Sequence, residues 1–211
     1  EEAAARIDCS VVQGFGMTEL SPVSHISLEG RSKPGTVGLT APNTEIRIVD
    51  PETGEDQDFD GIGELWIRGP QVMKGYLNNP SATEITIDPD GWLKTGDIGF
   101  IDSEGFVSIV DRLKELIKYK GFQVAPAELE ALLLTHPAIA DAAVIGVPDT
   151  EAGEIPRAYV VVRPGQEVSA VDITAFMEGQ VAKYKVIHDV VFIDEVPKSA
   201  SGKILRRMLR D

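Results

Sequence analysis

Apolar and polar residues alternate with a period of two along short segments of the first half of the chain. The clearest are residues 45–49 (EIRIV) and 64–68 (ELWIR), and this alternation predicts two half-buried strands. Two apolar runs, 98–101 and 106–110, flank the turn-forming sequence DSEG, which predicts a hairpin. Two further segments are expected at the start of the chain: the end of a helix over residues 1–6 and an extended segment over 7–13.

The pattern changes after Val110, where helical and extended segments alternate. Pro126 opens a helix that ends near residues 136–137, and Ser169 caps a second helix that is expected to reach Ala182. The remaining predicted elements are strands over 142–147, 158–162 and 189–193 and a short basic helix over 203–210. Together they form an α+β unit of about 100 residues, the size of one small domain.

The composition is that of a globular protein with an excess of acid. The chain has 211 residues, of which 43% are hydrophobic and 26% charged, and its formal net charge is −14. This charge argues against broad nucleic-acid binding, and no apolar run is long enough to predict a membrane span. The single cysteine, Cys9, cannot form an internal disulfide, which favours a cytoplasmic protein. Residues 50–60 hold six acids and no base, and we interpret them as a solvated loop.

Four polar segments carry candidate chemistry, and each also has an ordinary structural explanation. In residues 14–19 (GFGMTE), glycine N–H groups and a threonine hydroxyl suit a phosphate, and a glutamate suits Mg²⁺. A plain glycine turn explains the same residues, and they match neither the Walker A nor the dinucleotide-binding pattern. Asp97 ends the segment 92–97 (WLKTGD), where its two carboxylate oxygens suit ribose hydroxyls or an Asx-type turn.

The other two segments are basic. Residues 112–120 hold four cations, which fit either a solvated face or an anion site at a domain boundary. Lys203 follows the small-residue loop 197–202 (PKSASG), where it is either a phosphate contact or a plain exposed lysine. Taken singly, the four segments leave both explanations open.

In this order and spacing, the segments resemble the adenylate-forming superfamily of acyl-CoA ligases, adenylation domains and luciferases. The resemblance is greatest to 4-coumarate–CoA ligase-like and fatty acyl-CoA ligases, and it covers nearly the whole chain. The matching segments are residues 13–19, 63–70, 95–97, 111–130 and 197–207.

The resemblance implies a particular α+β architecture. Residues 1–111 would be the C-terminal part of a large AMP-binding domain, β-rich and containing a small distorted β-barrel. Residues 112–211 would be a complete, mobile lid domain with a three-stranded sheet, joined at a hinge near Asp111–Lys114. The Pro-Lys-Gly phosphate loop of the family has no match in this sequence, so we expect the 211-residue chain to be an inactive fragment of a longer enzyme.

The resemblance also implies roles for residues of the first part. Thr18 would contact the nucleotide phosphate, and Glu19 would bind Mg²⁺. Asp97 and Arg112 would hold the ribose. The nucleotide pocket would be lined by Gln13, Gly14 and Phe15. Since the family usually has tyrosine at position 15, Phe15 would keep only the stacking on adenine.

In the second part, the implied roles belong mainly to lysines. Lys114 lies at the hinge, and Lys118 and Gln123 would face the adenylate. The coenzyme A contact would be made by Lys120 and Gly121. Lys203 would bridge ATP and the incoming carboxylate. Related ligases are silenced by acetylation of this lysine, which implies a protein acetyltransferase as a partner.

The implied activity is a two-step ligation that uses ATP, Mg²⁺ and coenzyme A. An aromatic or fatty carboxylic acid forms an acyl-adenylate, the lid rotates, and the thiol of coenzyme A then takes the acyl group. Three alternatives remain open: a luciferase-like oxygenase, a carrier-loading adenylation domain, and a non-catalytic module that binds nucleotide or coenzyme A.

Overall fold

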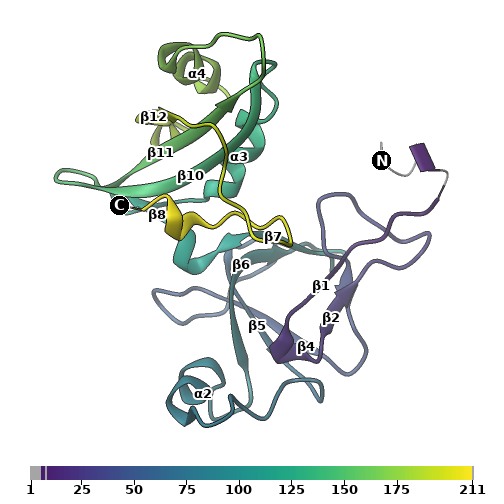
Figure 1. Ribbon diagram of the computed structural model, residues 1–211. Coiled ribbons are helices and arrows are strands. Elements are labelled where there is room, and N and C mark those ends of the chain that lie inside the picture. The colour runs from purple at the N-terminus through teal and green to yellow at the C-terminus, as the bar shows by residue number, and fades with distance from the viewer. Residues whose placement is uncertain (1–5, 8, 211) are drawn as a thin grey trace. The chain divides into compact units, whose positions relative to one another are not determined.

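The structure is a computed structural model, shown in Figure 1, and it describes residues 6, 7 and 9–210. The chain divides into two compact units: unit 1 ends at Leu113, and unit 2 begins at Lys114. Both units combine strands with helices, so the predicted α+β class is confirmed. No helix in the described part of the chain is long and apolar enough to cross a membrane.

A four-stranded antiparallel sheet forms the centre of unit 1. Its strands, in spatial order, are β4 (Glu45–Val49), β5 (Gly63–Arg68), β6 (Leu93–Ile101) and β7 (Val107–Arg112). The alternation predicted for β4 and β5 is confirmed, since Ile48, Leu65 and Ile67 are buried in one core. The predicted hairpin is confirmed as β6–β7, and the Asp102 carboxylate accepts two backbone hydrogen bonds in its turn.

A smaller antiparallel sheet brings the glycine-containing segment onto the same core. Its strands are β1 (Gly14–Gly16), β2 (Val23–Ile26) and β3 (Leu39–Thr40), and the 3-10 helix η1 (Thr18–Leu20) joins the first two. Leu20, at the end of η1, is fully buried in the core of the larger sheet. Helix α2 (Pro80–Thr86) begins after Asn79, whose side chain accepts a hydrogen bond from the N–H of Ala82.

Two predictions for unit 1 are wrong. The expected β-barrel is not closed, because the described strands form two open sheets and the edge strand β7 meets the segment before β3 only at the bridge between Gly38 and Val107. The described residues of the segment predicted to be extended, 7 and 9–13, belong to no strand either: Val11 and Val12 are exposed and have no partner strand among the described residues. Most of the helix predicted over 1–6 lies outside the described residues.

Unit 2 is built on a five-stranded sheet, where the sequence predicted three strands. β10 (Ile139–Asp149) and β11 (Gly153–Val162) form a long antiparallel hairpin, and β12 (Asp189–Phe192) adds parallel to β11. The two strands that the prediction missed are β8 (Ile117–Tyr119) and β9 (Phe122–Val124). Each has only three residues, too few for an alternation of apolar positions to indicate a strand.

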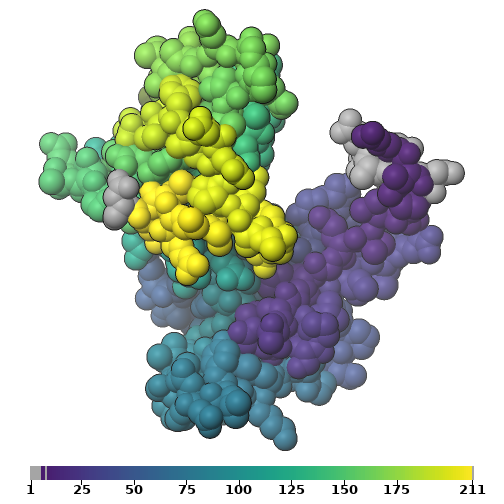
Figure 2. Space-filling model, viewed as in Figure 1, coloured from purple at the N-terminus to yellow at the C-terminus, as the bar shows by residue number. Residues whose placement is uncertain are grey.

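The two helices of unit 2 cover one face of this sheet, and the C-terminal segment covers the other. Helices α3 (Pro126–Leu133) and α4 (Ala170–Met177) pack on a core that includes Val144 and Val160. The side chains of Ile145 and Tyr159 point to the opposite face, where they pack with Leu209. Figure 2 shows the C-terminal segment, in yellow, lying over the surface of unit 2. Short 3-10 helices lie at Leu113–Glu115 (η2), Lys183–Lys185 (η3) and Arg206–Met208 (η4).

The predicted helix starts at Pro126 and Ser169 are confirmed, the second with a complete capping box. The second helix ends at Met177 rather than Ala182, because Gly179 adopts a left-handed conformation (φ 80°) that stops it. The basic helix predicted over 203–210 shrinks to the single turn η4. The N–H and C=O groups of Lys203 are both bonded to Ser199, so a helix cannot begin there.

Candidate functional site

The glycines of residues 14–19 allow β1 and β2 to approach each other closely. A Cβ atom on Gly16 would lie 1.9 Å from the carbonyl oxygen of Pro22, and one on Gly14 would lie 3.1 Å from that of His25. No side chain fits at position 16, so the fold itself requires this glycine. The packing of the two strands therefore explains Gly16 without any ligand.

Thr18 and Glu19 follow this strand in η1, Thr18 exposed and Glu19 half-buried. The Tyr76 hydroxyl donates a hydrogen bond to Glu19 Oε1 (2.7 Å), and the Met73 N–H donates one to the Glu19 carbonyl (2.8 Å). The bond to Glu19 raises the pKa of Tyr76. Tyr76 lies 57 residues after Glu19, and no sequence pattern linked the two.

The single carboxylate of Glu19 suits a Mg²⁺ ion that is held mainly by the phosphates of a nucleotide. The described residues contain no group of three or more His, Cys, Asp or Glu side chains arranged to hold a metal ion. Mg²⁺ usually keeps several waters and takes one or two carboxylates together with substrate phosphates, so a single carboxylate such as Glu19 fits it.

The half-buried Phe15 lies edge-on to His25, with ring centroids 6.0 Å apart. His25 is fully buried, its Nδ1 lies 2.9 Å from Ser24 Oγ, and its Nε2 has no partner within the described residues. Burial lowers the pKa of His25 to about 4, because the charged imidazolium would lose its water. A neutral imidazole therefore supports the ring of Phe15. Gln13 and Gly14, just before it, are exposed.

The two residues expected to hold a ribose are brought together by the β6–β7 pairing. Asp97 and Arg112 are cross-strand partners, and Arg112 Nε lies 3.1 Å from Asp97 Oδ1. The Asp97 side chain is 6% exposed and that of Arg112 is 52% exposed, so the carboxylate is oriented from inside the protein and the guanidinium faces solvent. The N–H of Asp97 donates to Thr95 Oγ1 (3.1 Å).

In unit 2, the predicted adenylate and coenzyme A contacts lie on the β8–β9 hairpin. Lys118 and Gln123 are cross-strand partners and both are exposed. Lys120 (φ 48°) and Gly121 (φ 83°) form the two-residue turn, in which both backbones are left-handed. Lys114, the predicted hinge residue, is exposed in η2.

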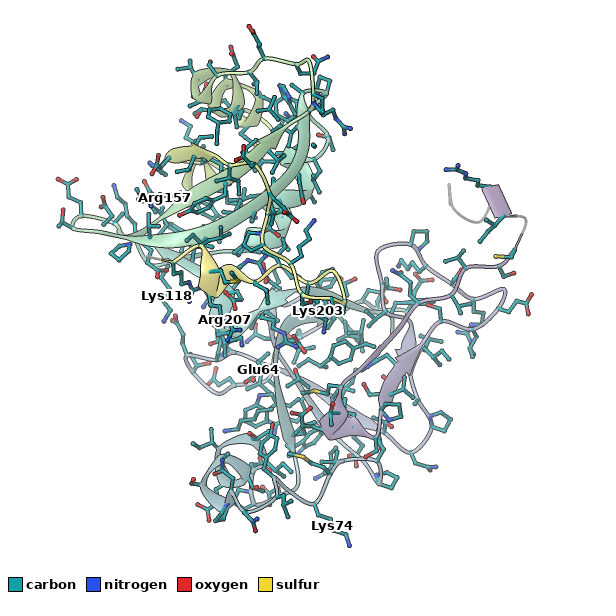
Figure 3. All side chains as sticks on the ribbon, in the orientation of Figure 1. Glu64, Lys74, Lys118, Arg157, Lys203 and Arg207 are labelled. Carbon is teal, nitrogen blue, oxygen red and sulfur yellow. The ribbon has the colours of Figure 1, made fainter. Side chains whose placement is uncertain are left out.

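Lys203 lies at the base of a tight turn. The Ser199 N–H donates to the Lys203 carbonyl (2.8 Å), the Lys203 N–H donates to Ser199 Oγ (3.2 Å), and Lys198 bridges to Ile204. The Lys203 side chain is exposed. Figure 3 labels Lys203 on this turn and Lys118 at a separate place on unit 2.

A buried ion pair that the sequence did not indicate anchors this segment. The Arg206 guanidinium donates to both carboxylate oxygens of Glu130 (2.8 Å each), and Glu130 Oε1 also accepts the N–H of Val144 (2.8 Å). Both side chains are largely buried, at 16% and 10% exposure. Glu130 looks like an exposed helix residue in the sequence, and only the sheet beneath α3 explains its burial.

The Lys203 turn and the β8–β9 turn lie at opposite ends of the β10–β11 hairpin. Lys198 pairs with Asp141 near the start of β10 (2.5 Å), whereas the N–H of Lys120 bonds to the Ala152 carbonyl just beyond the end of β10. The eight residues of β10 that follow Asp141 span roughly 26 Å at the usual rise of a strand. The two ends therefore cannot reach the same point at the same time.

Comparison with known proteins identifies the class to which these features belong. Residues 1–77 match the family "AMP-binding enzyme", and residues 128–203 match "AMP-binding enzyme C-terminal domain". ATP-bound MatB from Rhodopseudomonas palustris superposes with a TM-score of 0.93 at 35% identity, over 99% of this chain and 42% of that one. The chain belongs to the family of adenylate-forming, AMP-binding enzymes.

Within this family, several similar sequences are named 4-coumarate–CoA ligase or 4-coumarate–CoA ligase-like. The chain is 58% identical to 4-coumarate–CoA ligase 1 of Glycine max, over 94% of this chain and 70% of that protein. It is 54% identical to 4-coumarate–CoA ligase-like 4 of Oryza sativa subsp. japonica, over 94% of this chain. The chain spans only 36% of that rice protein.

Proposed function

We propose that this chain works as the C-terminal part of an ATP-dependent acid–CoA ligase, which we call the full-length ligase. The enzyme would convert a carboxylic acid and ATP into an acyl-adenylate and pyrophosphate, and then form acyl-CoA and AMP. The observation that carries this proposal is the pair of lysine-bearing turns at opposite ends of unit 2. An enzyme with two half-reactions needs one lysine-bearing turn for each of them, whereas a protein with a single binding step needs only one such turn.

In the first half-reaction, the acid's carboxylate attacks the α-phosphate and pyrophosphate leaves. The Thr18 hydroxyl donates to a phosphate oxygen, and the Lys203 ammonium offsets charge on the reacting oxygens. Glu19 would hold Mg²⁺, which when bound would supply further positive charge to the phosphates. Tyr76 fixes one oxygen of the Glu19 carboxylate through its hydrogen bond.

The nucleoside is held by residues of unit 1. The Asp97 carboxylate, with Arg112 beside it, accepts hydrogen bonds from the ribose hydroxyls. Phe15 supplies a ring face to adenine, while Gln13 and Gly14 line the pocket beside it. In unit 2, the paired side chains of Lys118 and Gln123 face the adenylate.

In the second half-reaction, unit 2 turns about residues 111–114, as the family resemblance implies. The Lys203 turn leaves, and the turn formed by Lys120 and Gly121 brings coenzyme A. The sulfur of coenzyme A bonds to the acyl carbon, the thiol loses its proton, and the carbonyl carbon–oxygen bond to AMP breaks. This is a domain-closure scheme of the hinge type.

The substrate class we propose is an aromatic or fatty acid. Val23 and Ile26, on β2 directly after the Thr18-Glu19 pair, are 42% and 43% exposed and offer an apolar surface to the acid. The relatives named for 4-coumarate support the aromatic choice.

Product analysis of the full-length ligase tests the proposal. With 4-coumarate, ATP and Mg²⁺, we expect pyrophosphate release without coenzyme A and acyl-CoA plus AMP with it. A panel of fatty acids then defines the substrate range. Light emission with a luciferin would instead favour a luciferase-like oxygenase, and transfer to a carrier protein would favour an adenylation domain. Absence of pyrophosphate release with every acid would leave only a binding module.

The 211-residue chain alone should not catalyse ATP–pyrophosphate exchange, since its sequence has no match to the family's Pro-Lys-Gly phosphate loop. Exchange by the isolated chain with any carboxylic acid would contradict this expectation. Acetylation of Lys203 stays a prediction, and an exposed ammonium on a turn is chemically open to it.

A further inference from the structure

The segment that carries Asp97 is a bulge in β6. Glu64 of β5 lies opposite Ile98, and Trp66 lies opposite Lys94, so two steps along β5 match four steps along β6. Three residues lie between Lys94 and Ile98 where β5 has only one, so β6 holds two extra residues in this segment, which includes Asp97. Bulges of this kind turn a strand locally and change the direction of its side chains.

The bulge leaves Gly96 with an N–H group that the sheet does not satisfy. Gly96 adopts a left-handed conformation (φ 72°), and its N–H donates to Glu64 Oε1 at 2.9 Å. The second oxygen, Glu64 Oε2, accepts the indole N–H of Trp66 at 2.7 Å. One carboxylate therefore closes the gap in the ladder that the bulge opens.

A further bond fixes the residue before Gly96. The Thr95 hydroxyl donates to the Leu65 carbonyl at 2.7 Å, and the hydroxyl oxygen of Thr95 accepts the N–H of Asp97. β5 thus holds the bulge at two consecutive positions, once through Thr95 and once through Glu64. Asp97 is the next residue, so its orientation depends on both.

The burial of Glu64 is unusual for its place in the strand. In β5 it alternates with core residues and shares the outer face with Trp66, yet it is only 7% exposed. Burying a carboxylate is costly unless it accepts hydrogen bonds, and here both oxygens do. A small apolar residue would avoid that cost but could not accept the N–H of Gly96. Figure 3 labels Glu64 among the side chains of unit 1.

We propose that Glu64 is a positioning residue for ribose recognition: it holds the bulge in the shape that aims the Asp97 carboxylate at the ribose hydroxyls. This inference rests on the proposed function, in which Asp97 holds the ribose. Glu64 touches no substrate in this role and acts only through the backbone of Gly96.

Discrimination between ATP and 2′-deoxy-ATP tests the proposal, because it measures ribose contact rather than general integrity. In the adenylation half-reaction of the full-length ligase, Asp97→Ala shows how much of the preference for ATP over 2′-deoxy-ATP is lost when the ribose contact is removed. Glu64→Ala should lower the preference for ATP, as a ratio of kcat/KM values, by roughly tenfold, the effect of one hydrogen bond to a charged group. The KM for the acid should not change.

A double substitution separates positioning from packing. In Glu64→Gln, the side-chain amide can satisfy only one of its two neighbours, and it must leave either the Gly96 N–H or the Trp66 N–H without an acceptor. Trp66→Phe removes the competing indole donor. The double variant should therefore recover ribose discrimination that Glu64→Gln loses. Glu45→Gln, at an exposed ion pair with Arg68 on the same sheet, is the matched control and should behave like the wild type.

Hydrogen exchange at Gly96 gives a readout that needs no catalysis. The amide should be protected in the wild type and should exchange faster in Glu64→Ala, with little change at amides of β7. Loss of discrimination in Asp97→Ala but not in Glu64→Ala would overturn the inference about Glu64 alone. Unchanged discrimination in Asp97→Ala would overturn the proposed ribose contact itself.

Discussion

Units 1 and 2 carry their proposed reactive segments in opposite ways. In unit 1, the segment of Thr18 and Glu19 and the strand of Asp97 rest on one core, which Leu20 and Leu93 share. In unit 2, the Lys203 turn and the β8–β9 turn lie at the two ends of a long hairpin. Unit 1 therefore holds its proposed contacts on one core, whereas unit 2 holds its proposed contacts at two separate ends.

Under the proposed function, this difference would give each unit a different task. Contacts that rest on one core keep a fixed geometry, which suits a nucleotide that stays bound through both half-reactions. Contacts at separate ends can serve one at a time, which suits two different co-substrates, ATP with its acid and then coenzyme A.

The largest expected effect is on the anchor of the Lys203 segment. Glu130→Ala leaves the buried Arg206 guanidinium without its carboxylate partner, and breaking a buried ion pair in this way costs about 3–5 kcal/mol of unfolding free energy. Hydrogen exchange at amides of β11 should measure this loss of unfolding free energy in unit 2. Both tryptophans, Trp66 and Trp92, lie in unit 1, so tryptophan fluorescence should report unchanged unfolding there.

The matched control is Glu128→Ala, on the same helix. Glu128 pairs with Lys185 at 2.6 Å, but the Glu128 side chain is 43% exposed. Its substitution should therefore lower the free energy of unfolding by only about 0–1 kcal/mol. Equal losses for the two variants would show that the Arg206 pair is not an anchor.

The next largest effect is expected at His25, whose ring packs against Phe15 in the glycine-containing strand of unit 1. The pKa of buried His25 is lowered to about 4, below its ordinary value of 6.5, so the unfolded state binds the proton first as the pH falls. The free energy of unfolding should therefore fall between pH 6.5 and pH 4, by about 3 kcal/mol in total for a shift of this size. Tryptophan fluorescence during urea unfolding measures it.

The control for this pH dependence is His25→Gln, which cannot titrate in this range. In this variant the free energy of unfolding of unit 1 should vary much less with pH between pH 6.5 and pH 4, whatever its value at pH 7. A profile as steep as that of the wild type would mean that another group titrates.

A smaller effect is expected at the opposite end of unit 2. Gly121 has φ 83°, and a Cβ atom there would meet no other atom within 4 Å. Gly121→Ala therefore tests the backbone alone, at a cost of about 1–2 kcal/mol. Thioester formation by the full-length ligase should slow roughly tenfold, while adenylation should not. Gly121→Asn should be milder, because asparagine tolerates this conformation, and equal slowing by both variants would contradict the explanation.

Local patterns in the sequence predicted the elements whose signal is contained in a few neighbouring residues. The alternation in β4 and β5, the turn at Asp102 and the capping box at Ser169 were all correct because each depends on nearby side chains. The expectation that Asp97 and Arg112 share one ribose site came from the family resemblance, and only the structure shows that the β6–β7 register makes them partners.

Features that depend on distant parts of the chain were missed. Tyr76 reaches Glu19 across 57 residues, and Arg206 reaches Glu130 across 76. Glu64 alternates like any outward-facing residue, and only the bulge in β6 explains why it is buried. These contacts depend on which strands lie side by side, and local periodicity carries no information about that.

The central claim is that unit 2 serves the two half-reactions with different ends, and Lys203→Gln in the full-length ligase tests it most directly. Single-turnover measurements should follow adenylation from ATP and thioester formation from supplied acyl-adenylate in the same preparation. We predict that adenylation falls about 10²–10³-fold, as when one charge-stabilising group is removed, while thioester formation keeps its rate. Equal slowing of both steps, or adenylation at the wild-type rate, would contradict the account.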